Sequence, residues 1–323
     1  MKFIKRFFIT LISLIALLLV TAYLVWMPSP QEPAYELVKT WGSKGDAPGQ
    51  FNEPTGITLA GNELFVSDAR NTRIQVFDLD GNFKRMFGEK GDDPGQLNRP
   101  MNLTVAGNEL YVADYFNDRI QVYGLDGSFK RNVGKSGSAG GEFSAPGGVA
   151  VAANGDLYVA DFYNQRVQQL KANGTFVRQW GTTKQVGVLK GKLNYPTDVA
   201  LSPTGKLFIA DGYNDRVLSY TADGKPATKW GGPLAMNIFG PFNGWFATVT
   251  NVTVGPSGNV FVADFYNDRV QKFTQDGKFL NVFGIKSTGL THTAIAAVEA
   301  DDGSVFVADY ANHQIQKWRP GNK

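Results

Sequence analysis

One pattern of residues recurs six times along the chain, and this repetition constrains the fold more than any other feature. Each copy has an apolar residue, then Ala or Ser, then Asp, and successive copies lie 45 to 53 residues apart. Asn follows each Asp after three positions, and Arg or Gln follows after five. A period of this length predicts one repetitive domain instead of two independent ones. The repeated aspartates are Asp68, Asp114, Asp161, Asp211, Asp264 and Asp309.

Four short runs typical of β-strands make up each copy. In the second copy they are residues 101–105, 110–114, 119–123 and 129–133. Gly-Asn and Asp-Gly pairs separate neighbouring runs, as they do in antiparallel hairpins. Four-stranded units of this length, repeated around a circle, predict a β-propeller.

The two ends of the array complement each other. Residues 35–42 match only a fourth strand, and the last copy stops after its third strand, residues 314–318. Joining the two ends completes a sixth blade and pairs strands that an open array would leave exposed. The sequence therefore predicts an all-β, six-bladed propeller over residues 35–323. Before the propeller we expect an N-terminal transmembrane helix over residues 1–27, followed by a stiff proline-rich linker over residues 28–34.

The repeated unit resembles the NHL repeat. The resemblance is carried by Tyr-Val-Ala-Asp-Tyr-Phe-Asn-Asp-Arg-Ile-Gln-Val-Tyr at residues 111–123, and by Pro-Gly-Gln-Leu-Asn-Arg-Pro at 94–100. It covers residues 35–319 and implies a six-bladed propeller. Members of the NHL family include receptor sensor domains, RNA-binding modules and a peptide-amidating lyase. The resemblance therefore leaves the function open.

The Asp-x-x-Asn-x-Arg turn lies on the same face as the connections between blades, because alternate connections of a four-stranded meander share a face. Asp and Asn side chains can satisfy turn amides, and a repeated Arg can bridge to a carboxylate or a carbonyl. A functional site rarely needs six copies, so we expect this motif to be structural.

The two residues after each repeated Asp include many aromatic side chains. One interpretation is that these rings pack between neighbouring blades. The other is that they form a binding platform, since aromatic residues are enriched at recognition sites. The candidate ligand-binding residues are Tyr115, Phe116, Phe162, Tyr163, Tyr213, Phe265, Tyr266 and Tyr310.

Two connections between blades depart from the regular pattern. Residues 231–246 join blades four and five and carry Phe239, Phe242, Trp245 and Phe246. These rings either cover the face or hold a partner, and irregular loops often carry function. Phe242, Trp245 and Phe246 therefore join the candidate ligand-binding residues. The connection over 285–293 carries His292, which we interpret as a surface residue.

The innermost strands begin at positions that ring the central channel. Three of these six positions carry oxygen ligands: Asn102, Asp198 and Asn251. They are similar in placement to the axial calcium sites of paraoxonase-like and related six-bladed hydrolases. Calcium takes six to eight oxygen ligands, so water would have to supply many of them. The alternative interpretation is the polar lining of a wet channel. We expect no cofactor, with calcium as the alternative.

The N-terminal segment has the composition of a membrane anchor. Residues 7–27 form a run of 21 residues without charge, preceded by Lys2, Lys5 and Arg6. About 20 apolar residues cross a bilayer as a helix, and cations before the run favour a cytoplasmic N-terminus. We expect a single-pass anchor in a bacterial cytoplasmic membrane with the propeller on the extracytoplasmic side. The alternative is a cleaved signal peptide and a secreted or periplasmic protein.

Composition excludes several kinds of site. The chain has no cysteine, which excludes disulfides, thiolate metal sites and cysteine nucleophiles, and its two histidines exclude a three-histidine zinc site. There are 32 basic and 29 acidic residues, and three of the bases precede the first acid, Glu32. The remainder is balanced and lacks the basic field that phosphate contacts require, so we do not expect nucleic acid as a partner.

Two functions fit these features. The first is a non-catalytic binding module, a sensor or scaffold held outside the membrane, with a protein, peptide or glycan of the cell envelope as its ligand. It resembles the anchored NHL domains of bacterial receptors. The alternative is an enzyme, either a calcium-dependent, lactonase-like hydrolase or a lyase, with an axial metal site. We favour the binding module.

Overall fold

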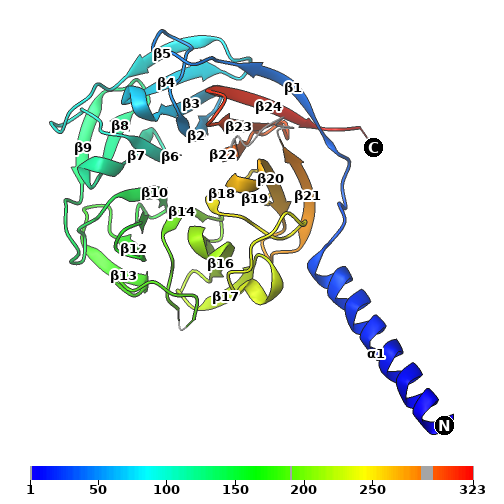
Figure 1. Ribbon diagram of the computed structural model, residues 1–323. Coiled ribbons are helices and arrows are strands. Elements are labelled where there is room, and N and C mark those ends of the chain that lie inside the picture. The colour runs from blue at the N-terminus through cyan, green and yellow to red at the C-terminus, as the bar shows by residue number, and fades with distance from the viewer. Residues whose placement is uncertain (1, 190, 285–293, 323) are drawn as a thin grey trace.

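Six four-stranded antiparallel sheets stand around a common axis, as Figure 1 shows. The computed structural model describes residues 2–189, 191–284 and 294–322, and within these residues all six sheets have the same up-and-down strand order. The predicted six-bladed propeller is confirmed. The connection over 285–293, with His292, lies outside the described residues.

The first strand of each blade lies innermost and the fourth lies at the periphery. Blade one contains β2 (Pro54–Ala60), β3 (Glu63–Asp68), β4 (Arg73–Asp78) and β5 (Phe83–Phe87). Blade two contains β6 (Pro100–Ala106), β7 (Glu109–Asp114), β8 (Arg119–Gly124) and β9 (Phe129–Val133). Blade three contains β10 (Pro146–Val151), β11 (Leu157–Asp161), β12 (Arg166–Leu170) and β13 (Phe176–Gly181).

The second half of the ring repeats this order. Blade four contains β14 (Pro196–Leu201), β15 (Leu207–Asp211), β16 (Arg216–Tyr220) and β17 (Pro226–Trp230). Blade five contains β18 (Val249–Val254), β19 (Val260–Asp264), β20 (Arg269–Phe273) and β21 (Phe279–Gly284). Blade six contains β22 (Ala294–Glu299), β23 (Val305–Asp309), β24 (Gln314–Pro320) and β1 (Tyr35–Trp41).

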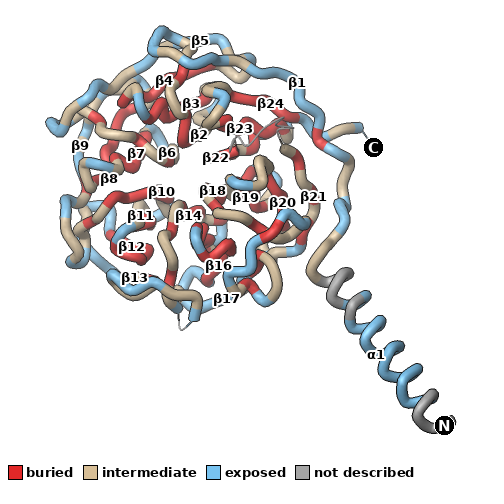
Figure 2. The backbone as a smooth tube through the Cα atoms, viewed as in Figure 1, coloured by how far each residue is buried: buried red, intermediate tan, exposed pale blue. Residues whose placement is uncertain are grey.

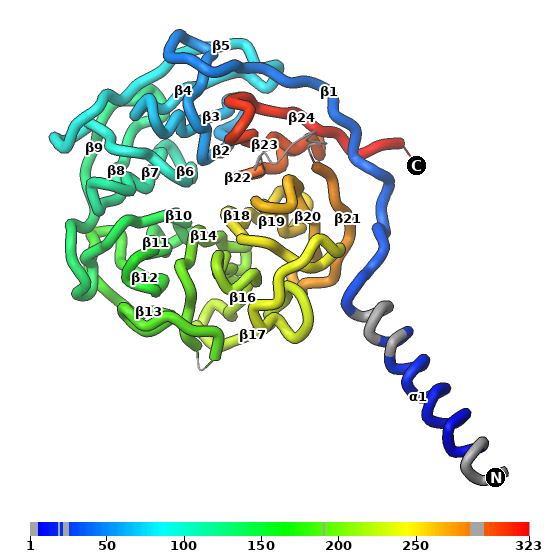
Figure 3. The backbone as a smooth tube through the Cα atoms, in the orientation of Figure 1, coloured from blue at the N-terminus to red at the C-terminus, as the bar shows by residue number. Residues whose placement is uncertain are grey.

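Blade six joins the two ends of the propeller. Strand β1 pairs antiparallel with β24, from Tyr35 opposite Pro320 to Trp41 opposite Ile315. Figure 3 shows this N-terminal strand beside the C-terminal one. The predicted closure is confirmed, and it removes the strand edges that an open array would expose.

The core lies between neighbouring blades, where buried residues line the inner and middle strands (Figure 2). One residue of each described connection between blades also belongs to it. These residues are completely buried at equivalent places: Phe51, Leu97, Phe143, Leu193 and Phe246. They fill the space between two blades, and their burial stabilises the ring.

Short 3₁₀ turns join the second and third strands of most blades. They are η1 (Ala69–Asn71), η2 (Tyr115–Asn117), η3 (Gly212–Asn214) and η5 (Phe265–Asn267). A residue with positive φ follows each turn, and its side chain often accepts a hydrogen bond from the next blade. Oε1 of Gln165, which has φ of 60° in the turn of blade three, accepts one from the backbone N–H of Tyr195 at 2.6 Å. The equivalent contacts join Asp118 to Ala145, Asp215 to Thr248 and His313 to Glu53.

Helix α1 (Lys2–Trp26) extends away from the propeller (Figure 1). Its described apolar side chains between Phe7 and Val20 are exposed, with Ile12 63% and Leu18 69% accessible. No helix within the described part of the chain has both the length and the hydropathy that crossing a membrane requires.

The proline-rich segment that follows α1 contacts blade five. The backbone N–H of Gln31 donates to the carbonyl of Leu280 at 2.7 Å, and Nδ2 of Asn281 donates to the carbonyl of Pro33 at 2.6 Å. Lys272 and Glu32 form an ion pair at 2.8 Å. The segment is therefore fixed along the edge of the ring.

Candidate functional site

The repeated Asp fixes the turn between the second and third strands. In blade three, Oδ1 of Asp161 accepts a hydrogen bond from the backbone N–H of Ser144 at 2.7 Å. Its Oδ2 accepts from Arg166 at 2.8 Å, Asn164 at 2.9 Å and Gln168 at 3.1 Å. Arg166 also donates to two backbone carbonyls of the preceding connection, at 2.8 and 3.0 Å. The expected structural role of this motif is confirmed, because a buried carboxylate has to be paired.

The other blades repeat these contacts with small changes. A further member of the motif was not recognised from the sequence. It is a Gln two positions after the Arg position, and in five blades its side chain donates to the repeated Asp. These residues are Gln75, Gln121, Gln168, Gln271 and Gln316. In blade six, Gln314 replaces the Arg and donates to Asp309 at 2.7 Å. The remaining pairs of Arg and Asp are Arg73 with Asp68, Arg119 with Asp114, Arg216 with Asp211, and Arg269 with Asp264.

Aromatic side chains from four consecutive blades surround a pocket of about 340 Å³. The pocket lies on the face that carries the 3₁₀ turns, and Asn102 lines both this pocket and the central channel below it. The structure brings together seven of the eight aromatic residues predicted from the repeated turns. They are Tyr115, Phe116, Phe162, Tyr163, Tyr213, Phe265 and Tyr266. Tyr310 lies beside them, with its ring centroid 5.9 Å from that of Phe265.

The two aromatic positions of each turn have different surroundings. The first residue of a pair is half-buried and contacts a neighbouring blade, as Tyr115 contacts Phe162 with ring centroids 5.9 Å apart. The second residue is exposed, 58% for Phe116 and 52% for Tyr163. Packing between blades therefore describes the first position of the pair, and the binding platform stays a prediction for the exposed second position.

Tyr195 belongs to the same cluster, although it comes from a connection between blades and not from a turn. Its ring centroid lies 4.8 Å from that of Phe162 and 5.2 Å from that of Tyr213. Blade four has Gly212 where blades two, three, five and six have an aromatic residue, and a Cβ there would lie 2.9 Å from the carbonyl oxygen of Tyr195. The small residue leaves the space that Tyr195 occupies. Three connections between blades have the pattern Asn-x-Pro, and this one reads Asn-Tyr-Pro at residues 194–196. The aromatic residue at the variable position was the sequence signal for Tyr195.

Charged side chains replace aromatic residues on the blade-one side of the pocket. Arg99 lines the pocket, lies 5.9 Å from the ring centroid of Phe116, and contacts Glu53 at 3.4 Å. Glu53 also pairs with Arg70. Burial works against ionisation of Glu53, but hydrogen bonds from Tyr310 and Arg70 hold the pKa of its carboxyl below the ordinary value. One carboxylate between two guanidinium groups leaves this edge with a net positive charge.

The floor of the pocket consists of residues in the first strand of each blade that have no pairing partner on the second strand. The register of every first strand shifts just after its first pair, as between Pro196 and Asp198 of β14. The residue between them, Thr197, lines the pocket, and its hydroxyl donates to the carbonyl of Val249 in the next blade at 2.8 Å. Such bulges turn a side chain out of the ladder. The equivalent floor residues are Thr55, Met101, Gly147, Thr250 and Ile295.

Burial also affects the tyrosine hydroxyls of the pocket. It raises the pKa of Tyr115 far above the ordinary range, with a further contribution from the hydroxyl of Tyr163. Burial likewise raises the pKa of Tyr213 and Tyr310. These hydroxyls therefore stay protonated at neutral pH. Those of Tyr310 and Tyr115 already bond to Glu53 and Tyr163, and that of Tyr213, which lines the pocket, can donate to a ligand.

Comparison with known families agrees with this architecture. Residues 143–170 match the NHL repeat family, and residues 50–126 match a family described as a 6-bladed beta-propeller. The chain is a six-bladed β-propeller that contains an NHL repeat. A stretch of 48 residues is 46% identical to the protein named brain tumor from Drosophila melanogaster. The match covers 15% of this NHL-repeat propeller and 5% of that relative, so the chain spans only a small part of its length.

Solved structures share the fold over most of the chain. A streptogramin B lyase has 16% identity and a TM-score of 0.59, and the match covers 89% of this chain and 98% of that one. A catalytically inactive virginiamycin B lyase from Staphylococcus aureus with quinupristin has 17% identity and a TM-score of 0.57, with 90% of each chain covered. A protein of unknown function from Bacteroides thetaiotaomicron reaches a TM-score of 0.65 at 18% identity, covering 89% and 76%. At these identities the likeness shows the fold alone.

The three predicted metal ligands line the central channel of the NHL-repeat propeller. Oδ2 of Asp198 accepts hydrogen bonds from Nδ2 of Asn251 at 2.7 Å and from the backbone N–H of Val252 at 3.1 Å. Oδ1 of Asn251 accepts from the N–H of Ala297, and Oδ1 of Asn102 is buried without a hydrogen-bond partner. The described residues contain no group of three His, Cys, Asp or Glu side chains placed to hold a metal ion. One carboxylate, already bonded to N–H donors, fits a calcium ion poorly, since calcium takes six to eight oxygens.

The candidate residues of the connection between blades four and five lie apart from the aromatic pocket. Phe246 is completely buried beside Phe273, with ring centroids 5.7 Å apart, so its predicted place in a ligand site is wrong. It occupies the core position of the connections, equivalent to Phe51. Trp245 lines a different pocket, and its indole N–H donates to the carbonyl of Trp26. Phe242 contacts Trp245 at a centroid distance of 5.1 Å and is 43% exposed.

Proposed function

We propose that this propeller is a binding module that holds part of a peptide or a glycan in its aromatic pocket. The observation that carries the proposal is the row of exposed rings from blades two to five around a pocket of about 340 Å³. Exposed aromatic residues provide a large contact area with few rotatable bonds, and sugar rings and aromatic side chains stack on them. A pocket of this size admits one or two residues of a longer ligand.

The polar groups of the pocket are suited to orienting a ligand. The hydroxyl of Tyr213 can donate a hydrogen bond to the ligand. Arg99 supplies a cation at one edge. Among the described residues that line the pocket there is no histidine or carboxylate to act as a general base. These features favour binding over catalysis.

A variant without the exposed rings tests this proposal. Phe116, Tyr163 and Tyr266 are replaced together by Ser, and the matched control is Phe176→Ser, an exposed ring on the outer strand β13. Binding of wild type and variants is measured on arrays of peptides and envelope glycans, followed by titration of each hit. Loss of one ring at a binding hot spot costs about 2 kcal/mol, or roughly thirtyfold in Kd. Hits that the triple variant binds as tightly as the wild type contradict the proposal.

We also propose that α1 tethers the propeller to a membrane. An extracytoplasmic propeller stays a prediction from the sequence. The exposed apolar side chains of α1 support the tether, because water solvates such a surface poorly. Lys2, Lys5 and Arg6 before the apolar run favour a cytoplasmic N-terminus. Flotation of the full chain with lipid vesicles tests the tether, and recovery of the protein at the bottom of the gradient would contradict it.

An enzyme with an axial calcium ion remains the second prediction, for Asn102, Asp198 and Asn251. Metal analysis of the purified chain and thermal unfolding with and without a chelator test it. We expect no change of the unfolding midpoint with chelator, because Asp198 already bonds to Asn251 and Val252.

A further inference from the structure

The connection between blades four and five differs in charge from the other connections. Residues 230–263 contain no charged side chain. The connections at residues 42–54, 88–100, 134–146 and 181–196 all contain charged residues. Charged residues are costly to move from water into a membrane, and an uncharged connection avoids that cost.

The same connection exposes its apolar side chains. Phe239 is 73% and Leu234 is 69% accessible, and Ile238 and Phe242 are exposed beside them. Leu234, Ala235 and Asn237 all have positive φ, between 50° and 62°. This conformation is unfavourable for residues other than glycine, and strained backbone of this kind concentrates at functional sites. The fold therefore holds an apolar loop outward in a conformation that the chain would not adopt by itself.

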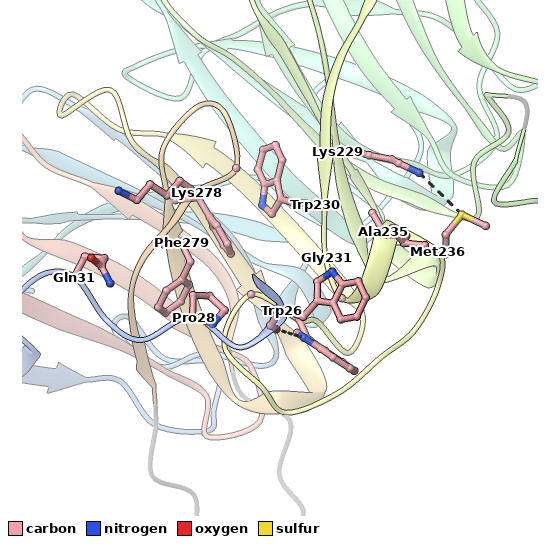
Figure 4. A pocket seen from close by; sticks show the side chains of 16 residues that line it. Trp26, Pro28, Gln31, Lys229, Trp230, Gly231, Ala235, Met236, Lys278 and Phe279 are labelled. Atoms are coloured by element: carbon pink, nitrogen blue, oxygen red, sulfur yellow. Dashed lines mark hydrogen bonds between the residues drawn. The ribbon is translucent and has the colours of Figure 1, made fainter. Parts of the chain in front are cut away.

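Hydrogen bonds hold this loop next to the end of α1. The indole N–H of Trp245 donates to the carbonyl of Trp26, and Nδ2 of Asn243 donates to the carbonyl of Pro28 at 3.0 Å. A groove of about 830 Å³ lies between the two segments. Figure 4 shows Lys278 on the blade-five side of Trp26 and Pro28, and Lys229 on the blade-four side.

We infer that the connection over residues 231–246 is a membrane-contact loop, and that the surface it contacts is an anionic lipid bilayer. This rests on the proposed tether, because α1 would bring the loop to the membrane. Leu234, Ile238, Phe239 and Phe242 enter the headgroup region without carrying a charge into it. Lys229 and Lys278 line the groove next to the loop and attract anionic headgroups.

The loop also orients the propeller. Hydrogen bonds already fix the segment after α1 to the ring, and a second contact with the bilayer sets the tilt of the propeller relative to the membrane. The connections between blades and the 3₁₀ turns lie at the same end of the strands, so the loop and the aromatic pocket share one face. The pocket therefore binds its ligand close to the membrane surface.

The absence of cysteine from the sequence gives a direct test. Phe239→Cys in the full chain carries an environment-sensitive fluorophore, and Leu234→Cys repeats the measurement at a second exposed site. Val177→Cys, exposed on β13 of blade three, is the matched control. The labelled proteins are bound to vesicles of phosphatidylcholine and phosphatidylglycerol, with and without spin-labelled lipid that quenches nearby fluorophores.

We expect a blue shift and lipid-dependent quenching at positions 239 and 234, and neither at 177. Flotation with equal, weak quenching at all three positions would overturn the membrane-contact loop and leave the tether intact. A blue shift at 239 without quenching by lipid would also overturn it, because the loop would then contact protein. Failure to float would remove the tether and the loop together, whatever the arrays show for the aromatic pocket.

Discussion

At the scale of single residues, two buried carboxyl groups of the propeller have different kinds of hydrogen-bond partner, a cation or neutral amides. Asp161 accepts hydrogen bonds from the guanidinium of Arg166 and remains paired with a cation. Asp198 accepts from the amide of Asn251 and the backbone of Val252, and burial raises the pKa of its carboxyl to about 8. The two environments differ because one side chain anchors a turn and the other lines the channel.

The raised pKa of Asp198 predicts how the stability of the propeller changes with pH. The folded state holds this proton up to about pH 8, whereas the unfolded chain releases it near pH 4. Stability contributed by the group is therefore complete below pH 4 and is lost as pH rises to about 8. Relative to Asp198→Asn, the free energy of unfolding of the wild type falls by about 1.4 kcal/mol per pH unit over this window.

Urea unfolding at intervals from pH 5 to 9 measures this difference. Asp301→Asn, at an exposed carboxylate, is the control. A difference between wild type and Asp198→Asn that does not change with pH would mean that the carboxylate is ionised in the fold.

At the scale of the elements, the turn between the second and third strands is the unit that fixes one connection to its blade. Blade six has Gln314 at the Arg position, and this smaller side chain still donates a hydrogen bond to the repeated Asp, Asp309. Arg166 bonds to Asp161 and also to the carbonyls of Ala139 and Glu142. Gln is too short to make all of these contacts.

Arg166→Gln therefore retains the bond to Asp161 and loses the bonds to the connection. Removing one partner of a buried ion pair leaves the other insufficiently paired, and we expect a loss of about 3 kcal/mol in the free energy of unfolding. The midpoint of urea unfolding measures it. Arg319→Gln, at an exposed Arg of β24, is the control. Equal midpoints for the two variants would contradict the role of the carbonyl contacts.

Much of this element could be predicted because six copies allow each position to be compared with five others. The repeated Asp, Asn and Arg are recognised as structural in this way. Aligning Gly244-Trp245-Phe246 with Gly49-Gln50-Phe51 would also have placed Phe246 in the core. Tyr195 and the outward course of residues 233–242 have no counterpart in the other copies. The position of Tyr195 depends on its contact with Phe162, and that of the loop depends on contacts with the segment after α1. Comparing the copies with one another cannot predict such contacts.

At the scale of the whole molecule, hydrogen bonds from one blade to the next close the ring. In blade three Gln165 accepts from the backbone N–H of Tyr195, and in blade six Nδ1 of His313 accepts from the N–H of Glu53 at 3.0 Å. The second contact joins the two ends of the propeller, from residue 313 back to residue 53. It requires a neutral imidazole, because a protonated Nδ1 cannot accept.

The closing contact therefore depends on pH. Burial lowers the pKa of His313 below 6.5, and Lys44 lowers it further against the attraction of Glu53, Asp309 and Asp68. Stability contributed by this group is present above pH 6.5 and is lost as pH falls through the lowered pKa.

The variant His313→Gln tests this dependence. Its side-chain oxygen can accept the same hydrogen bond as Gln165 does in blade three, and both positions have a positive φ. The variant has no group at this position that titrates. We expect the wild type to lose stability relative to His313→Gln as pH falls below 6.5, measured by urea unfolding. Parallel profiles would contradict a neutral histidine at the closure. Asp198 loses stability as pH rises and His313 as pH falls, so the two variants shift the optimum of the whole propeller in opposite directions.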